Sequence, residues 1–201
     1  MIYKTYYDSP VGKLFIASDG ENIIGLCIEG QKYYLNKLEK EGILENDLPI
    51  FDKTRKWLDS YFKQEKPKIS ELSLAPEGNV FRQSVWEFLC KIPYGETITY
   101  GELAKKVAKK LNKSSMSAQA IGNAVGHNPI SIIIPCHRVV GKNGNLTGYA
   151  GGIDKKIKLL KHEGININKF FIPKHKSKKK KRKNYMSNWG RFCLGHFELN
   201  M

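Results

Sequence analysis

The chain has 201 residues, of which 41% are hydrophobic and 26% charged, with a formal net charge of +15 at pH 7. This length and apolar content allow one large or two small domains with a packed core, and the absence of a long apolar stretch argues against an integral membrane protein. The N-terminus has neither the charged nor the apolar segment of a secretory signal, so we expect a cytoplasmic protein, or a nuclear one in a eukaryotic cell.

The basic charge is concentrated at the C-terminus. Residues 170–201 contain nine Lys or Arg and one Glu, whereas residues 1–169 are only moderately basic. We expect residues 169–201 to form a disordered basic tail, with a DNA-binding arm or a nuclear import signal as the functional alternatives. A basic protein suits a phosphate backbone as partner, but charge alone does not establish one.

The first half of the chain predicts a small domain of strands and short helices. Residues 1–28 alternate apolar and polar side chains, with Asp19-Gly20 as the turn of a hairpin. Helices are expected at 33–40 and 53–62. Residues 63–79 combine charge, prolines and a glycine, which is typical of a connection or an edge strand, so the domain boundary is placed near residue 75.

The second half predicts a helix-turn-helix. Residues 80–91 have apolar side chains at helical spacing, and Pro93 and Gly95 end that helix. Thr99 and Glu102 form a capping box that begins the next helix. After a polar break at 112–116, residues 117–125 form a short helix of small residues. Such a pair of helices could dock on DNA or could pack inside an enzyme core.

The segment "IIIPCHRVVG" places a thiol, an imidazole and a guanidinium after an apolar run. The pattern predicts a buried strand at 130–134, ended by Pro135, with Cys136 at its rim. A nucleophilic thiolate needs a base or a positive charge nearby, which His137 and Arg138 could supply, His137 directly or through water. The alternative is a buried, inert cysteine followed by His and Arg on the surface.

Four cysteines are spread along the chain without the spacing of a metal site or a redox pair. We therefore expect reduced thiols, no structural metal and no cofactor.

Three segments carry a family resemblance: "VFRQSVWEFLCKIPYGETITYGELA", "AIGNAVGHNPISIIIPCHRVV" and "GYAGGIDKKIKLLKHEG". Together they resemble the active-site region of the O6-alkylguanine-DNA alkyltransferases, also called methylated-DNA–protein-cysteine methyltransferases. Residues 1–75 resemble the N-terminal domain of that family more loosely. The resemblance implies an α+β fold, in which an N-terminal ribonuclease-H-like β-sheet domain (1–75) precedes a winged-helix-like helix-turn-helix domain (76–168) that carries the active-site cysteine.

The family flips O6-alkylguanine out of double-stranded DNA and moves the alkyl group irreversibly onto a cysteine, which here is Cys136. The resemblance implies that the thiol proton passes through water to His137, held by Glu163, and that Tyr100 donates a hydrogen bond to the base. Without the resemblance, Glu163 is a solvated residue at a helix end and Tyr100 a packing residue. The implied partner is duplex DNA, with no membrane, no obligate protein partner and a monomeric state.

The resemblance also assigns binding residues. Those expected to contact DNA are Ser117, Gln119, Ala120, Asn123, Asn128 and Arg138, and those expected to line the base pocket are Val139, Tyr149, Ala150 and Gly151. Two positions depart from the family pattern, since Gln119 stands where an arginine is common and Ala150 where many relatives have serine. The segment 105–117, with five lysines, is long for the family and could add phosphate contacts.

Two other functions remain open at this stage. A non-enzymatic reader of damaged DNA, as in the alkyltransferase-like proteins, would lack the cysteine, and Cys136 is present. A thiol hydrolase using Cys136 and His137 would turn over repeatedly and would not require DNA.

Overall fold

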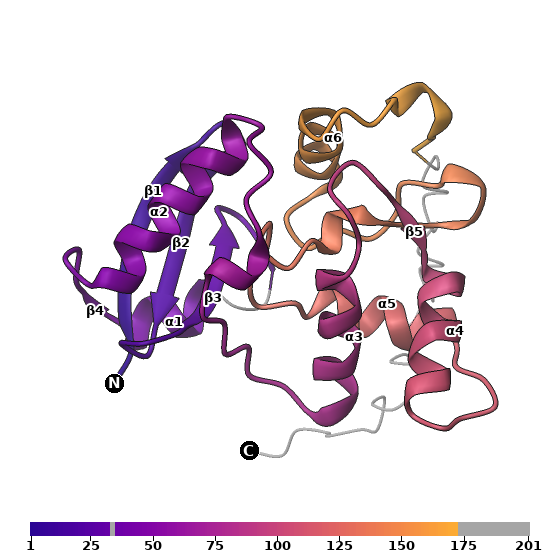
Figure 1. The fold of residues 1–201 in the computed structure, drawn as a ribbon, viewed down its shortest axis with the longest axis horizontal. Helices are drawn as coiled ribbons and strands as arrows, with labels where there is room; N and C mark the ends of the chain where they lie inside the picture. The colour runs from indigo at the N-terminus through magenta and orange to yellow at the C-terminus, as the bar shows by residue number, and fades with distance from the viewer. Residues whose placement is uncertain (33–34, 173–201) are drawn as a thin grey trace, which may run out of the picture.

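A computed structural model describes residues 1–32 and 35–172, which form two units lying side by side (Figure 1). An N-terminal unit is built on a β-sheet, and a C-terminal unit is mainly helical, so the expected α+β class is confirmed. Residues 173–201, which hold nearly all of the expected disordered tail, lie outside the described residues. Within residues 1–32 and 35–172, no helix is long and apolar enough to cross a membrane.

The N-terminal sheet has four strands in the order β3-β2-β1-β4. The first three pair antiparallel and the fourth pairs parallel to β1. The predicted hairpin is confirmed, because Asp19 accepts hydrogen bonds from the amides of Glu21 and Asn22 in the turn before β3. The strands are β1 (Tyr3–Ser9), β2 (Gly12–Ser18), β3 (Ile23–Ile28) and β4 (Ile43–Leu44).

Two helices cover the two faces of this sheet, α1 (Leu35–Glu41) and α2 (Pro49–Phe62) (Figure 1). Leu14 and Ile16 of β2 pack in the core that includes α2, whereas Phe15 and Ala17 pack with Leu38 of α1. Both faces are therefore buried, which explains why β2 is continuously apolar. The predicted helix 53–62 begins earlier than expected, with Pro49 in its first turn, where a proline loses no helical hydrogen bond.

The connection between the units covers the free edge of β3. Ile23 donates its amide to the carbonyl of Ser73 and accepts from the amide of Ala75. On the same strand, Leu26 pairs with Ile130 of the C-terminal unit. An unpaired edge would leave backbone groups exposed, so this pairing both protects the sheet and fixes the second unit against it.

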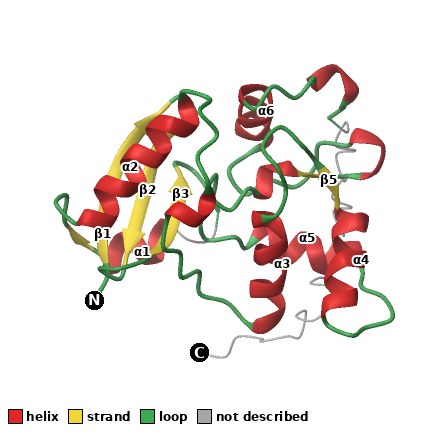
Figure 2. Ribbon diagram, viewed as in Figure 1, coloured by secondary structure: helices red, strands yellow, loops and turns green. Residues whose placement is uncertain are grey.

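The C-terminal unit is built around the helices α3 (Val80–Cys90), α4 (Tyr100–Lys110) and α5 (Ala118–Gly126), which pack against one another (Figure 2). The capping box is confirmed, since Thr99 accepts from the amide of Glu102 and the Glu102 carboxylate accepts from the amide of Thr99. The predicted helix-turn-helix corresponds to α4 and α5. The other elements are β5 (Ile98–Thr99), β6 (Val139–Val140), which pairs parallel with β5, and α6 (Ile153–His162).

The predicted strand at 130–134 is wrong. The segment is buried as expected, but only Ile130 pairs with the sheet, and the chain then turns, with Ile132 at a φ of 70°. A β-branched residue seldom adopts this left-handed conformation, which costs about 1–3 kcal/mol. The side chain of Asn128 sets the turn by donating to the carbonyls of Ile130 and Ile134 and accepting from the amide of Ile130.

Candidate active site and DNA interface

Cys136 begins a short 3₁₀ helix, Cys136–Arg138, directly after this turn. It is only 4% exposed, so it lies below the surface rather than at the rim of a strand. The three cysteines that the structure describes, Cys27, Cys90 and Cys136, are free thiols. Burial raises the pKa of the Cys136 thiol, although the side-chain amide of Asn128 and the charge of Lys156 act in the opposite direction. The resting sulfur therefore carries its proton and needs a base.

His137 is fully buried, and its Nε2 lies 2.7 Å from Oε1 of Glu163. Because the ionised carboxylate only accepts hydrogen bonds, Nε2 carries the hydrogen and Nδ1 is left as the basic nitrogen. Nδ1 is buried and has no hydrogen-bond partner among the described residues. Burial lowers the pKa of His137 despite the nearby carboxylate, so the ring is neutral at pH 7 and can accept a proton.

Glu163 follows the last residue of α6 but is 5% exposed, so the alternative of a solvated helix end is wrong. Its carboxylate accepts hydrogen bonds from Tyr61, His137, Arg138 and the amide of Gly95. Burial opposes ionisation, but the hydrogen bonds from His137 and Arg138 and the charge of Arg138 outweigh it and lower the pKa of Glu163 to about 2. The carboxylate is thus a fixed negative charge that orients the imidazole.

Arg138 does not lie where a DNA contact was expected. Its guanidinium is buried, with Nε 2.9 Å from Oε2 and Nη2 3.0 Å from Oε1 of Glu163. The remaining nitrogen donates to the carbonyl of Ile92 at 2.6 Å. With these donors engaged inside the protein, the guanidinium cannot reach a phosphate on the surface, and we leave Arg138 out of the proposed DNA-contacting set. Its role is to compensate the buried carboxylate.

Lys156 of α6 is fully buried and donates to the carbonyls of Val139, at 2.5 Å, and Thr147, at 3.3 Å. Burial lowers its pKa to about 8, while the Cys136 sulfur acts in the opposite direction. At pH 7 the ammonium is therefore mostly charged and stabilises the thiolate form of Cys136. Through its two carbonyl contacts it also ties the chain after Cys136 to the loop that contains Thr147.

Tyr100, the first residue of α4, contacts the same loop. Its hydroxyl donates to the carbonyls of Gly148, at 3.1 Å, and Thr147, at 3.3 Å. Burial and the charge of the Cys136 thiolate raise the pKa of Tyr100 to about 12, so the hydroxyl remains a donor at neutral pH. A Cβ added to Gly148, whose φ is 61°, would lie 3.4 Å from this hydroxyl, which explains the need for glycine there.

The other expected pocket residues lie in and next to the same loop. Val139 is buried in β6, and Tyr149 faces the sulfur closely enough that burial and the thiolate charge raise its pKa well above 10. The carbonyl of Ala150 accepts from the amide of Lys32 in the N-terminal unit, and a Cβ on Gly151 would lie 2.9 Å from the Tyr149 ring. The loop around the sulfur is thus held by both units.

The second helix, α5, presents the residues that were expected to contact DNA. Ser117 caps the helix by accepting from the amide of Ala120. Ser117, Gln119 and Asn123 are exposed, and Ala120 is half-buried. Asn128, in contrast, is 2% exposed and faces the turn before Cys136, where it links the end of α5 to the sulfur.

Two family models match nearly all of the described residues. Residues 2–76 match "6-O-methylguanine DNA methyltransferase, ribonuclease-like domain", and residues 80–165 match "6-O-methylguanine DNA methyltransferase, DNA binding domain". The methylated-DNA–protein-cysteine methyltransferase of Haemophilus influenzae is 46% identical over 165 residues, which cover 82% of this chain and 87% of that protein. The chain belongs to this family. The methyltransferase of the same name from Methanosarcina acetivorans is 42% identical and covers 81% and 99% of the two chains.

Solved structures of methyltransferases share the fold. The crystal structure of Mycobacterium tuberculosis O6-methylguanine methyltransferase has a TM-score of 0.70 at 38% identity and covers 81% of this chain and 93% of that chain. Mycobacterium tuberculosis OGT in complex with DNA has a TM-score of 0.69 at 36% identity and covers 84% and 94%. The expected ribonuclease-like and helix-turn-helix units are therefore confirmed.

Two residues of this methyltransferase site were missed from the sequence. Tyr61 belongs to α2 of the N-terminal unit, and its hydroxyl donates to Glu163 at 2.8 Å, 102 residues away in the chain. The sequence predicts a helix at this position, but nothing local reveals a partner this distant. Lys156 could have been found, because it lies three and four residues before the buried Leu159 and Leu160 of α6 and so on the buried face of that helix.

Proposed function

We propose that this member of the methylated-DNA–protein-cysteine methyltransferase family repairs DNA by moving an alkyl group from O6 of a flipped guanine to the sulfur of Cys136. The observation that carries the proposal is the buried group of Cys136, His137 and Glu163, in which the His137 ring is bound to Glu163 and its other nitrogen is left unpartnered in the part of the chain that the structure describes. It combines a free thiol, a neutral imidazole with one unpartnered nitrogen, and a carboxylate with a pKa of about 2. In this arrangement an oriented base can take the proton of a thiol that is buried away from bulk water.

The proposed reaction uses only side chains of the protein and the alkylated base. The thiol proton passes to Nδ1 of His137, either directly or through one water, and Glu163 stabilises the resulting imidazolium. The sulfur then attacks the alkyl carbon, so that an S–C bond forms as the C–O6 bond breaks. The electron pair of the broken bond leaves with the guanine, which becomes neutral by taking up one proton, while His137 gives up the proton that it took from the thiol. Tyr100, whose hydroxyl stays protonated at neutral pH, exchanges its bonds to the carbonyls of Thr147 and Gly148 for one to the departing base and lowers the charge of that base.

The product explains why one molecule repairs one base. The new C–S bond belongs to a dialkyl thioether, which water does not hydrolyse even beside a base such as His137, so the sulfur stays alkylated. The sulfur is 4% exposed and contacts the Asn128 side chain, so the added group also sits inside the packed turn. We therefore expect a single turnover without a cofactor.

The proposed DNA interface is the exposed face of α5. Ser117, Gln119 and Asn123 can donate to phosphates and bases, while the small Ala120 lets the helix backbone come close to a groove. Gln119 brings no charge where relatives commonly carry arginine, so we expect weaker base extrusion. A Gln119→Arg variant should bind DNA more tightly and transfer the alkyl group faster, and unchanged values of both would contradict this role.

Intact-mass spectrometry tests the proposed activity. The protein is incubated with a duplex containing one O6-methylguanine, and its mass is followed with time. We expect a gain of one CH₂ unit per molecule, stoichiometric with the lesion and final. An unmodified protein that still binds the duplex would indicate a non-enzymatic reader, and multiple turnovers of a thioester without DNA would indicate a hydrolase.

A monomeric state, the absence of an obligate protein partner and a cytoplasmic location stay predictions. Analytical ultracentrifugation of the free protein and fractionation of the cells that make it are the direct tests.

A further inference from the structure

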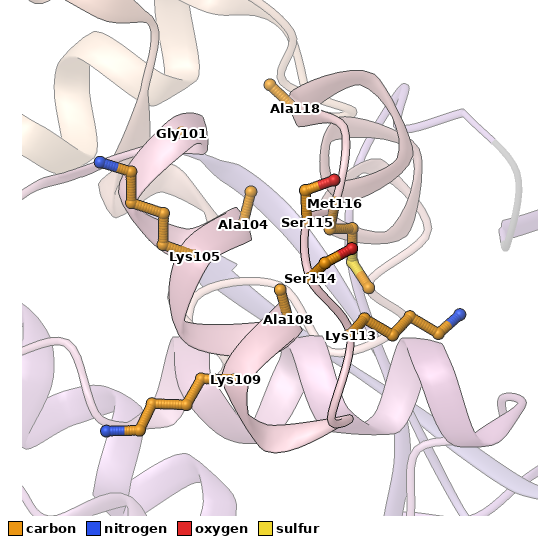
Figure 3. Close-up of a pocket in the computed structure, with 10 residues that line it drawn as sticks. All are labelled: Gly101, Ala104, Lys105, Ala108, Lys109, Lys113, Ser114, Ser115, Met116 and Ala118. Carbon is orange, nitrogen blue, oxygen red and sulfur yellow. The ribbon is translucent and has the colours of Figure 1, made fainter.

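An exposed hollow, which we call the α4 groove, lies beside α4 (Figure 3). In the C-terminal unit, α4 lies on the side away from the N-terminal unit (Figure 1). The α4 groove has a volume of about 620 Å³ and lies between α4 and the chain segment that leads to α5. Its floor is apolar and its rim basic: Ala104, Ala108 and Met116 form the floor, and Lys105, Lys109 and Lys113 form the rim.

The three rim lysines are exposed and not held in ion pairs by the residues that the structure describes. Lys105, Lys109 and Lys113 are exposed, and within residues 1–32 and 35–172 none of them has a carboxylate oxygen within 4.0 Å. Lys110, in contrast, is paired with Glu87. None of the ten residues that line the α4 groove is acidic. The charge of Glu102 acts on Lys105, but three lysines against this one carboxylate leave the α4 groove with a net positive charge, which favours an anionic partner.

The position of the α4 groove indicates which anion it meets. At one end it is lined by Gly101 and Ala118, in the first turns of α4 and α5, and Ala118 directly precedes Gln119 of the proposed DNA-contacting face (Figure 3). A duplex held on that face would therefore lie beside this end of the groove. Lys105 extends from α4 on one side of the hollow and Lys113 from the connecting segment on the other.

We propose that the α4 groove binds phosphates of the DNA backbone beside the stretch that α5 contacts, an inference that rests on the proposed function. Lysine ammonium groups on flexible stems suit phosphates as point charges, and the exposed hydroxyls of Ser114 and Ser115 can donate to the same oxygens. The groove adds affinity without sequence preference, because phosphate contacts position a protein but do not read bases.

Salt dependence gives a quantitative test. Binding of the full-length protein to an unmodified duplex is measured by fluorescence anisotropy over a series of salt concentrations. Each phosphate contact contributes about 0.9 to the slope of log K against log salt, so the K105Q/K109Q/K113Q variant should lose about 2 to 3 units of slope. Each single variant should lose about 1. The K105R/K109R/K113R variant keeps the charges and should keep the slope.

The matched control is K53Q/K56Q/K63Q, which removes three exposed lysines from α2 and its C-terminal end, in the N-terminal unit. Its slope should change by less than about 1, because it alters the net charge equally but not the groove. An unchanged slope in the groove variant, or an equal loss in both triple variants, would overturn the proposal. So would a groove variant that loses affinity for single-stranded RNA but not for the duplex.

The activity assay separates this inference from the proposed function. At low salt and saturating methylated duplex, the groove variant should be alkylated as completely as the wild type, because the buried site is untouched. A wild type that gains no alkyl group would refute the proposed function whatever the slopes are. A wild type that is alkylated, together with an unchanged slope in the groove variant, would refute only the groove.

Discussion

Replacing Glu163 by Gln removes the charge on which the buried site depends. The carboxylate accepts bonds from three side chains and one backbone amide, and its own side chain is fully buried. Glutamine has one acceptor oxygen, so its NH₂ group must face N–H donors of Arg138 or Gly95. The variant leaves the guanidinium of Arg138 buried without a counter-charge.

Two arguments give the expected loss of stability in Glu163→Gln. The pKa of Glu163 falls from an ordinary 4.5 to about 2, and at about 1.4 kcal/mol per pKa unit this corresponds to about 3 kcal/mol of stabilisation. Breaking one partner of a buried ion pair costs about 3–5 kcal/mol. We therefore expect Glu163→Gln to lower the free energy of unfolding at pH 7 by about 3–5 kcal/mol.

The pH dependence has a definite sign. The folded-state pKa of Glu163 lies below its unfolded value, so its contribution is complete above about pH 5 and disappears as the pH falls toward 2. The difference in free energy of unfolding between the wild type and Glu163→Gln, measured with urea, should therefore become smaller as the pH falls from about 5 to about 2. Glu77→Gln, an exposed control, should stay within about 0.5 kcal/mol of the wild type.

Glu163→Gln also tests the role of Glu163 in alkyl transfer. Because His137 loses the group that orients it, the single-turnover rate of alkyl transfer should fall about 10²- to 10⁴-fold. A Glu163→Gln protein that unfolds within about 0.5 kcal/mol of the wild type, or that keeps a constant gap between pH 5 and pH 2, would refute this reasoning.

Three further substitutions probe the supporting residues. Tyr61→Phe should lower stability by about 1–3 kcal/mol in urea unfolding, because Glu163 loses a buried donor; an unchanged midpoint would contradict that role. Lys156→Met removes the charge that favours the thiolate, so the rate of alkyl transfer should fall at pH 7 and recover at higher pH, whereas the exposed Lys158→Met should match the wild type throughout. Asn128→Ala leaves the amide of Ile130 without its partner, while the carbonyls of Ile130 and Ile134 lose one donor each and keep a backbone amide. The variant should cost about 1–3 kcal/mol in the same unfolding measurement and slow transfer; a change confined to DNA affinity would instead favour a surface role.

Local chemistry explains what could be predicted from the sequence. The capping box of Thr99 and Glu102 is satisfied within four residues, and helical spacing located α3 and α5 closely. The pairing of Cys136 with His137 depended on adjacency in the chain. Glu163 came from the family resemblance, since its burial depends on α2 and the segment after α3, which no local pattern reveals.

Tertiary context explains the errors. The isoleucine run was correctly predicted as buried, but burial does not distinguish a strand from a turn, and the side chain of Asn128 replaces the sheet hydrogen bonds that a strand would need. Arg138 was assigned to DNA from the family resemblance, and from the residues alone it was expected only to add positive potential beside Cys136. The buried carboxylate of Glu163 needed a counter-charge, and that requirement becomes visible only once both residues are placed.

The location of the transferred group tests the central claim most directly. After reaction with a duplex carrying O6-methylguanine, the protein is digested and its cysteine-containing peptides are sequenced by mass spectrometry, with Cys136→Ala as the matched variant. We predict one methyl group on Cys136, none on Cys27 or Cys90, and no loss of the lesion with Cys136→Ala. A methyl group on another cysteine, or repair by Cys136→Ala, would contradict the account.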